Sequence, residues 1–151
     1  VAGYGETGNP DNVPEATLDA WQREGIIDYL GQRDDMPQVY AQAQVVCLPS
    51  WREGVPLALI EGAACGRPLV ASDVPGCREV VRHEETGLLA PPRDAASLAA
   101  ALRRLLLEKA TRQRMGAAGR ELAQREFSLE RVISETLALY ERVLNRKRLS
   151  R

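Results

Sequence analysis

The 151-residue sequence has little of the residues that most often carry metal or redox chemistry, with one histidine and three cysteines. Cys47, Cys65 and Cys77 are an odd number at irregular spacings, which matches neither a disulfide framework nor a zinc site. We therefore expect three reduced thiols, as in a cytosolic protein, and no bound metal. The single histidine, His83, stands in an acidic stretch, and we expect it to be exposed and without a catalytic role.

An excess of charge of one sign is also missing, because 20 lysines and arginines face 21 acidic residues. Dedicated nucleic-acid binders usually show a strong basic bias, so we expect no nucleic-acid partner. No apolar run approaches the roughly 20 residues that a membrane-spanning helix needs. We expect a cytoplasmic protein. Its basic end is either a solvated tail or a peripheral contact with the inner face of an anionic membrane, through Arg142, Arg146, Lys147, Arg148 and Arg151.

Apolar residues make up 44% of the chain, and strand-like runs alternate with helical patterns. After a strand end at residues 1–2, the predicted strands are Ile26–Leu30, Val45–Leu48, Leu69–Ala71 and Gly87–Ala90. The predicted helices run from Asn12, as the cap, to Glu24, from Asp34 or Asp35 to Gln42, and over Pro56–Cys65, Arg78–Arg82, Asp94–Glu108, Thr111–Glu126 and Leu129–Arg146.

This alternation predicts an α/β fold, in which a doubly wound parallel sheet is flanked by helices, with extra helices at the C-terminal end. We expect residues 1–151 to form a single domain, since the length suits one and no linker interrupts it. Sheets of this kind bind ligands at the carboxyl ends of their strands, close to the point where strand order reverses.

One segment, residues 49–62, carries the chemistry expected at that edge. Glu53 lies in a loop after a buried strand, and Glu61 follows within the next helix, with seven residues between them. Gly54 and the start of the helix offer free backbone N–H groups, which can bind a phosphate. A carboxylate accepts two hydroxyl hydrogen bonds well. The segment is therefore suited to a sugar and a ribose on either side of a diphosphate.

This segment resembles the Glu-x7-Glu signature of the family 4 type retaining glycosyltransferases with the GT-B fold, the glycosyl transferases group 1. Other landmarks of that family follow in the same order over residues 1–145. They are Val1-Ala2-Gly3-Tyr4-Gly5, Tyr29-Leu30-Gly31, Gly66 to Ser72, Pro75-Gly76 with Glu79, Thr86 to Leu89, Pro92 with Asp94, Met115-Gly116 and Phe127-Ser128. Val55 stands where the family often has an aromatic residue, and Gly62 where alanine is frequent.

The resemblance implies a Rossmann-like domain that binds a nucleotide-diphosphate sugar, with a UDP-type donor favoured over a GDP-type donor and no metal or other cofactor. It implies that Glu53 is catalytic and faces the donor sugar, and that Glu61 holds the ribose. It further implies that the sugar and diphosphate lie along the backbone of Gly54, Val55, Pro56 and Leu57. Gln32 and Arg33 are the candidates for the base.

The same resemblance implies that an N-terminal acceptor domain, with the phosphate-binding arginine and lysine, precedes this chain, and that the C-terminal helix over residues 129–147 crosses to it. We expect that helix to expose apolar residues such as Val132, Leu139 and Val143, or to dock on a second copy of the chain. The isolated chain is then expected to bind donor weakly and to transfer nothing. A non-catalytic nucleotide-sugar binding module and a sugar-nucleotide epimerase of the same fold remain alternatives.

Overall fold

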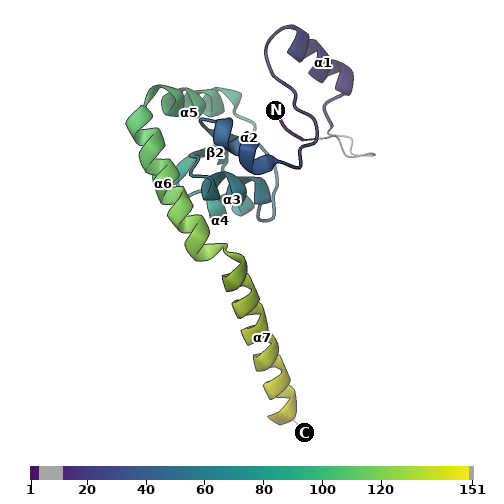
Figure 1. The fold of residues 1–151 in the computed structure, drawn as a ribbon, viewed down its shortest axis with the longest axis vertical. Coiled ribbons are helices and arrows are strands. Elements are labelled where there is room, and N and C mark those ends of the chain that lie inside the picture. Colours follow the sequence, from purple (N-terminus) through teal and green to yellow (C-terminus); the bar gives the residue numbers. More distant parts are fainter. Residues whose placement is uncertain (4–11, 150–151) are drawn as a thin grey trace. The chain divides into compact units, whose positions relative to one another are not determined.

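The computed structural model describes residues 1–3 and 12–149, with side chains up to residue 145. The chain forms two compact units, Val1–Gln38 and Val39–Arg151 (Figure 1). Tyr4 and Gly5 of the expected glycine turn lie outside the described residues, as do the side chains of Arg146, Lys147 and Arg148 and the whole of Arg151.

The described residues of the first unit contain α1 (Glu15–Arg23) and the beginning of α2 (Met36–Gln42). Two expectations fail here. The N-cap of α1 is Pro14, not Asn12, because proline already has the extended backbone that a cap position needs (φ −56°, ψ 140°). Residues 26–30 form no strand, and residues 1–3 are exposed. Ala2 makes only an isolated parallel bridge to Gly31, so the apolar run has no sheet to join within the described residues of this unit.

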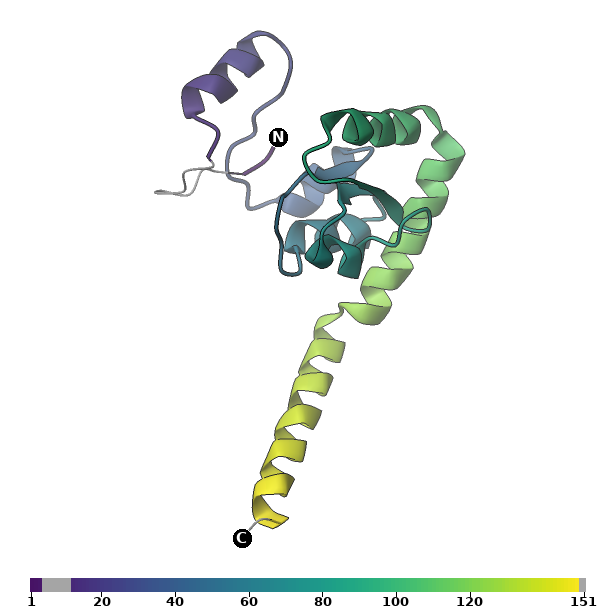
Figure 2. The ribbon, with the colours of Figure 1, turned by 180° about the vertical axis from the view of Figure 1, so that it is seen from behind.

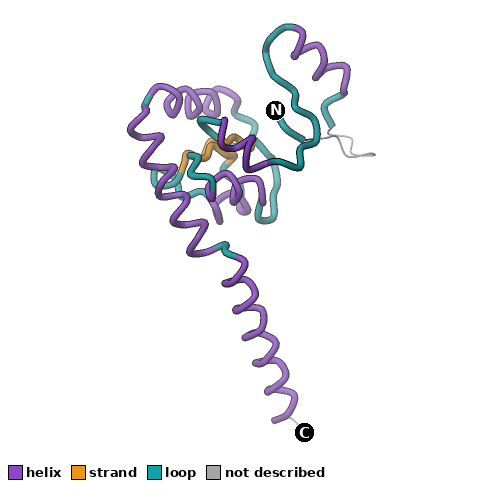
Figure 3. Tube along the Cα trace, viewed as in Figure 1, coloured by secondary structure: helices purple, strands orange, loops and turns teal. Residues whose placement is uncertain are grey.

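The second unit is built on a parallel sheet of β1 (Val46–Leu48), β2 (Leu69–Ser72) and β3 (Gly87–Ala90), with the strands in chain order (Figure 3). In register, Val46 pairs with Leu69, and Ser72 pairs with Ala90. These strands match the predicted ones to within a residue at each end. β1, expected to be buried, is only partly buried with Cys47 exposed, because it is an edge strand of this sheet. The expected α/β class with a parallel sheet between helices is confirmed, while these three strands contain no reversal of strand order.

Helices cover both faces of the sheet, and successive strand residues serve opposite faces (Figure 2). Leu69 and Ala71 point to the side of α3 (Leu57–Ala64) and α4 (Pro75–Val80). Val70 points to the side of α5 (Ala95–Leu107). The short helix α4 begins three residues earlier than predicted, since Pro75 fits a first helical position.

Two long helices end the chain, α6 (Lys109–Glu126) and α7 (Leu129–Leu149). α6 contributes to both sides of the sheet, with Met115 in the cluster under α5 and Ala123 in the cluster with α3 and α4. α7 starts after a break at residues 127–128, and every residue from 129 to 145 is exposed. Val132, Leu139 and Val143 are 51%, 49% and 47% exposed, as the sequence led us to expect.

Candidate nucleotide-sugar site

The loop between β1 and α3 lies at the carboxyl end of a sheet strand, where the sequence placed the site. Pro56 is buried and caps α3, and its carbonyl oxygen accepts the N–H groups of Leu59 at 3.1 Å and Ile60 at 3.3 Å. Proline has no N–H of its own to satisfy at this position. The loop therefore leads directly into the N-terminus of α3.

Unpaired backbone donors line this loop. Within the described part of the chain, the N–H groups of Gly54, Val55 and Leu57 donate to no other group. Val55 is 51% exposed and Leu57 is 70% exposed, so this stretch of the chain lies at the surface. A Cβ atom added at Gly54 would meet no atom of the described residues within 4 Å, so open space adjoins the backbone of this turn. Such amides, together with a helix N-terminus, can bind an anion.

The first carboxylate of the signature, Glu53, is partly buried in this loop. No side chain in the described residues forms an ion pair with it. The negative charge of Glu53 acts on the core residue Cys77. The pKa of the Cys77 thiol is raised mainly by burial and additionally by this charge. Glu53 thus retains its hydrogen-bonding capacity for a ligand hydroxyl.

The second carboxylate, Glu61, is exposed on α3 and is held by a residue that the sequence did not single out. Oε2 of Glu61 accepts the hydroxyl of Tyr40 at 3.1 Å. Tyr40 is 5% exposed, and burial, followed by its hydrogen bond to Glu61, raises the pKa of its phenol. The phenol therefore stays protonated and acts as a donor that orients Glu61. No spacing signal connects two residues 21 positions apart.

Gly76, at the start of α4, shapes the loop from below. A Cβ atom here would overlap the carbonyl oxygen of Gly54 and lie 2.5 Å from the carbonyl oxygen of Glu53. Only glycine allows this close approach of two backbones. The sequence marks the Pro75-Gly76 pair as a family landmark, but its contact with the signature loop is visible only in the tertiary structure.

The candidates for the base belong to the first unit. Gln32 is exposed, and Arg33 is engaged in a bidentate pair with Asp35, with N···O distances of 2.7 and 2.6 Å. The Arg33 guanidinium holds the pKa of the Asp35 carboxyl below its usual range. A base that binds at Arg33 would have to share this guanidinium with Asp35.

The remaining expectations concern single residues and general features. His83 is exposed, and its Nδ1 accepts the N–H of Leu89 at 3.0 Å. The three cysteines are free thiols. Among the described residues there is no group of three or more histidine, cysteine or acidic side chains placed to hold a metal ion. The helices in that same part of the chain are too short or too polar to cross a membrane.

Comparison with known proteins gives a consistent result. The family model described as glycosyl transferases group 1 matches residues 1–108. A D-inositol 3-phosphate glycosyltransferase of Kribbella flavida is 37% identical over 141 residues, which cover 90% of this chain and 33% of the relative. A phosphatidyl-myo-inositol mannosyltransferase of Mycobacterium leprae is 41% identical over 128 residues, which cover 81% of this chain and 34% of the relative.

Solved structures agree with this. Sucrose-phosphate synthase from Thermosynechococcus elongatus superposes with a TM-score of 0.77 at 37% identity, over 87% of this chain and 33% of that one. HepE from Anabaena, solved in complex with UDP, gives a TM-score of 0.79 at 26% identity, over 91% of this chain and 39% of that one. The chain spans about a third of the length of the curated relatives. On these matches and on its fold, the chain belongs to the glycosyl transferases group 1 family.

Proposed function

We propose that this chain binds the nucleotide-diphosphate sugar of a retaining glycosyltransferase at the loop of residues 53–57 and the first two turns of α3. One observation carries the proposal. Two carboxylates and three unpaired backbone N–H groups lie on the loop and helix that directly follow the carboxyl end of β1. In the proposed complex Glu53 accepts hydrogen bonds from the donor sugar, and Glu61, oriented by Tyr40, accepts those of the ribose.

The diphosphate is the group that the unpaired amides suit. Negative charge grows on it as the bond to the sugar breaks, and fixed N–H donors stabilise such charge without reorganisation. The positive end of the α3 dipole adds to this effect. With these donors in place, the proposal needs no metal, so a chelator should leave donor binding unchanged. The UDP complexes of HepE make uracil the first base to test.

The test is calorimetric titration of the chain with UDP, UDP-glucose and GDP. We expect the UDP ligands to bind more tightly than GDP. Glu61→Ala should weaken both UDP ligands at least tenfold, because both carry the ribose. Glu53→Gln should weaken the binding of UDP-glucose more than that of UDP, because only UDP-glucose carries the donor sugar. Glu141→Ala, an exposed carboxylate on α7, is the matched control.

Equal affinities of wild type and Glu61→Ala for UDP would contradict the proposed ribose contact. An equal loss of affinity for UDP and UDP-glucose in Glu53→Gln would contradict the contact with the donor sugar. Glu53 would then act only in shaping the loop. Arg33→Ala tests whether Arg33 recognises the base of the nucleotide. A weaker preference for UDP over GDP is the expected result, and an unchanged preference excludes Arg33 from base recognition.

A further inference from the structure

A pocket of about 230 Å³ lies in the second unit at the amino ends of β1 and β2. Its wall comes from Gln44, just before β1, from residues 66–68, just before β2, and from residues 109, 112 and 113 at the start of α6. The loop of residues 53–57 follows the carboxyl end of β1, at the opposite edge of this parallel sheet, and shares no residue with the pocket. The pocket is therefore separate from the proposed donor site.

The lining of this pocket is strongly basic. None of its residues is acidic, and three are cations, namely Arg67, Lys109 and Arg112. In the part of the chain that the structure describes, the ammonium group of Lys109 makes no ion pair or hydrogen bond. The carboxylate next to it in sequence, Glu108, already accepts the hydroxyl of Thr111 at 2.8 Å and Nε of Arg104 at 3.4 Å. The excess of positive charge favours an anionic ligand.

The guanidinium of Arg67 has unmet hydrogen-bonding capacity. Its Nε is buried and has no hydrogen-bond partner among the described residues. Its Nη2 donates to the carbonyl oxygen of Ala41 at 3.1 Å, which anchors the side chain. Almost all buried polar atoms in proteins are hydrogen-bonded, and an unpaired one calls for an explanation, such as an ion that completes the site. Arg67 offers the fork of N–H donors that binds two oxygens of one phosphate group.

The start of α6 departs from the usual charge pattern of helices. The positive end of the helix dipole favours acidic residues, yet the first turn of α6 has none, and Lys109 opens the helix. Arg112 follows three residues later and is fixed through Nη1, which donates to the carbonyl oxygens of Leu105 at 2.7 Å and Leu106 at 2.9 Å. Its Nε and Nη2 make no hydrogen bond within the described residues. Positive side chains and a positive helix end thus coincide, and a bound anion would be stabilised by both.

The chemistry and size of the pocket select the ligand. Two guanidinium groups and an ammonium group suit the tetrahedral oxygens of a phosphate. A phosphate group carries about −1.5 to −2 charges at pH 7, which matches this lining better than the single charge of a carboxylate. Pockets for drug-sized ligands measure about 300–1,000 Å³, so this smaller one suits a phosphate group rather than a whole nucleotide.

We propose that this pocket binds a phosphate group, at a second site remote from the donor diphosphate. The inference does not rest on the proposed function, because the residues of the pocket take no part in donor binding. A small soluble phosphate and a phospholipid headgroup present the same chemistry. The headgroup is a candidate source because Leu106 and Leu107, just before α6, are 52% and 71% exposed.

The experiment is a ¹H–¹⁵N NMR titration of the 151-residue chain with inorganic phosphate, with sodium chloride at equal ionic strength as the control. We expect saturable shifts in the millimolar range for the amides of Gly66, Arg67 and residues 109–113. Arg67→Gln and Lys109→Gln should each weaken phosphate binding about tenfold, as expected for the loss of a hydrogen bond to a charged group.

The variants are chosen so that the fold is preserved. Lys109 is exposed and unpaired, so Lys109→Gln should keep the fold even if Arg67→Gln does not. Arg120→Gln, an exposed arginine of α6 outside the pocket, is the matched control and should leave the affinity unchanged.

Co-sedimentation with phosphatidylglycerol vesicles, and with phosphatidylcholine vesicles as the control, distinguishes the two sources. Phosphate binding without sedimentation identifies a soluble phosphate. Sedimentation with phosphatidylglycerol that Lys109→Gln abolishes and Arg120→Gln keeps identifies the headgroup. The site is overturned by shifts confined to residues 54–57, by the absence of both phosphate and vesicle binding, or by binding that is equal in the wild type and in both pocket variants.

Discussion

The two last helices of the chain, α6 and α7, are of similar length but differ in burial. α6 has 18 residues, is the more polar of the two, and buries Met115, Gly116, Gly119, Leu122 and Ala123. α7 has 21 residues and carries an apolar stripe at helical spacing, yet all of its described side chains are exposed. Apolar content therefore does not decide which helix joins the core. α6 packs against the core with one face, where Gly116 lets it approach the backbone of Gly66 closely.

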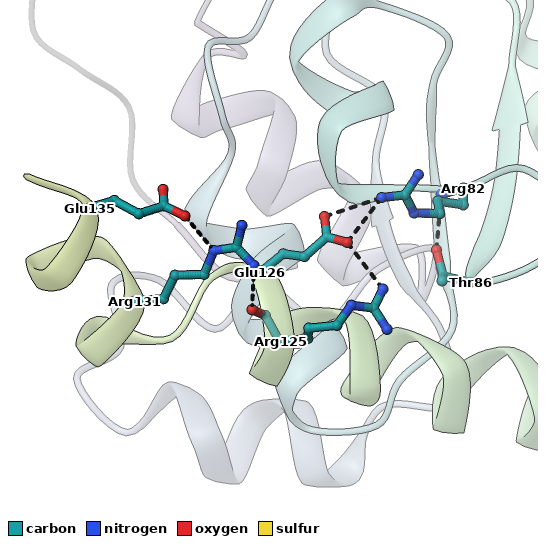
Figure 4. A network of polar contacts seen from close by, with 6 residues as sticks. All are labelled: Arg82, Thr86, Arg125, Glu126, Arg131 and Glu135. Atoms are coloured by element: carbon teal, nitrogen blue, oxygen red, sulfur yellow. Dashed lines mark hydrogen bonds and ion pairs between the residues drawn. The ribbon is translucent and has the colours of Figure 1, made fainter. Parts of the chain in front are cut away.

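Charged groups surround the junction between the two helices (Figure 4), where Phe127 also packs against the core cluster of α3 and α4. The carboxylate of Glu126 accepts Arg82 at 3.1 and 3.2 Å and Arg125 at 3.0 Å. Arg131, in the first turn of α7, donates to the carbonyl oxygen of Arg125 at 3.0 Å and to Glu135 at 2.7 Å. Because most of these groups are exposed, such pairs contribute little free energy.

The largest expected effect comes from truncation of the α6 core residue. Met115 is fully buried, so Met115→Ala should lower the free energy of unfolding by about 2–5 kcal/mol. Urea denaturation with far-UV circular dichroism measures this. Met115→Leu, which nearly conserves volume, should cost less than about 1.5 kcal/mol. Equal losses in the two variants would mean that the cavity is not the cause.

The glycines of α6 give a sharper version of the comparison. A Cβ atom at Gly116 would overlap the carbonyl oxygen of Gly66, so Gly116→Ala should destabilise the fold by about 1–3 kcal/mol. A Cβ atom at Gly119 would make ordinary contacts, 3.7 Å from Ala63, so Gly119→Ala should be neutral or stabilising by up to about 1 kcal/mol. Thermal unfolding of the pair checks the difference in sign. The same sign for both would show that helix propensity outweighs the close contact.

A smaller effect should follow from the junction. Hydrogen bonding to Arg125 and the charge of Arg82 hold the pKa of Glu126 below its usual range. A carboxyl whose pKa falls on folding stabilises the fold above its unfolded pKa, and this contribution is lost as the pH falls below about 4. Glu126→Gln should therefore lower the free energy of unfolding slightly at pH 7. The variant should also lose less stability than the wild type between pH 5 and pH 3, which lie on either side of about 4. Melting curves across that range test it. Identical pH profiles of wild type and variant would contradict the proposed ion pair, and Glu141→Gln serves as the control.

The smallest effect is expected on α7. Leu137 is 55% exposed, so Leu137→Ala in this chain should change the free energy of unfolding by no more than about 0.5 kcal/mol. The contrast with Met115→Ala tests the comparison directly, since both changes truncate a large apolar side chain on a helix. A loss of more than about 1 kcal/mol would show that α7 is covered in solution, by a second copy if the loss depends on protein concentration.

Much of the second unit could be predicted from local sequence. The β3 run ends at Pro91 as expected, and Asp94 caps α5 by accepting the N–H of Ser97 at 2.9 Å. These features depend on residues within a few positions of one another. The first unit was predicted less well, because the apolar run of residues 26–30 becomes a strand only where a neighbouring strand offers hydrogen bonds.

For the site, the sequence by itself determined the order of chemical groups. A strand, a loop with Glu53 and Gly54, and a helix with Glu61 follow from spacing and turn chemistry alone. Only the tertiary structure decided what supports them. The Tyr40 hydroxyl on Glu61, the Gly76 backbone against Gly54, and the Arg93 guanidinium over the Trp51 ring all join segments far apart in the chain. Local patterns specify dihedral angles and periodicity, whereas these contacts depend on how the sheet brings distant loops to one edge.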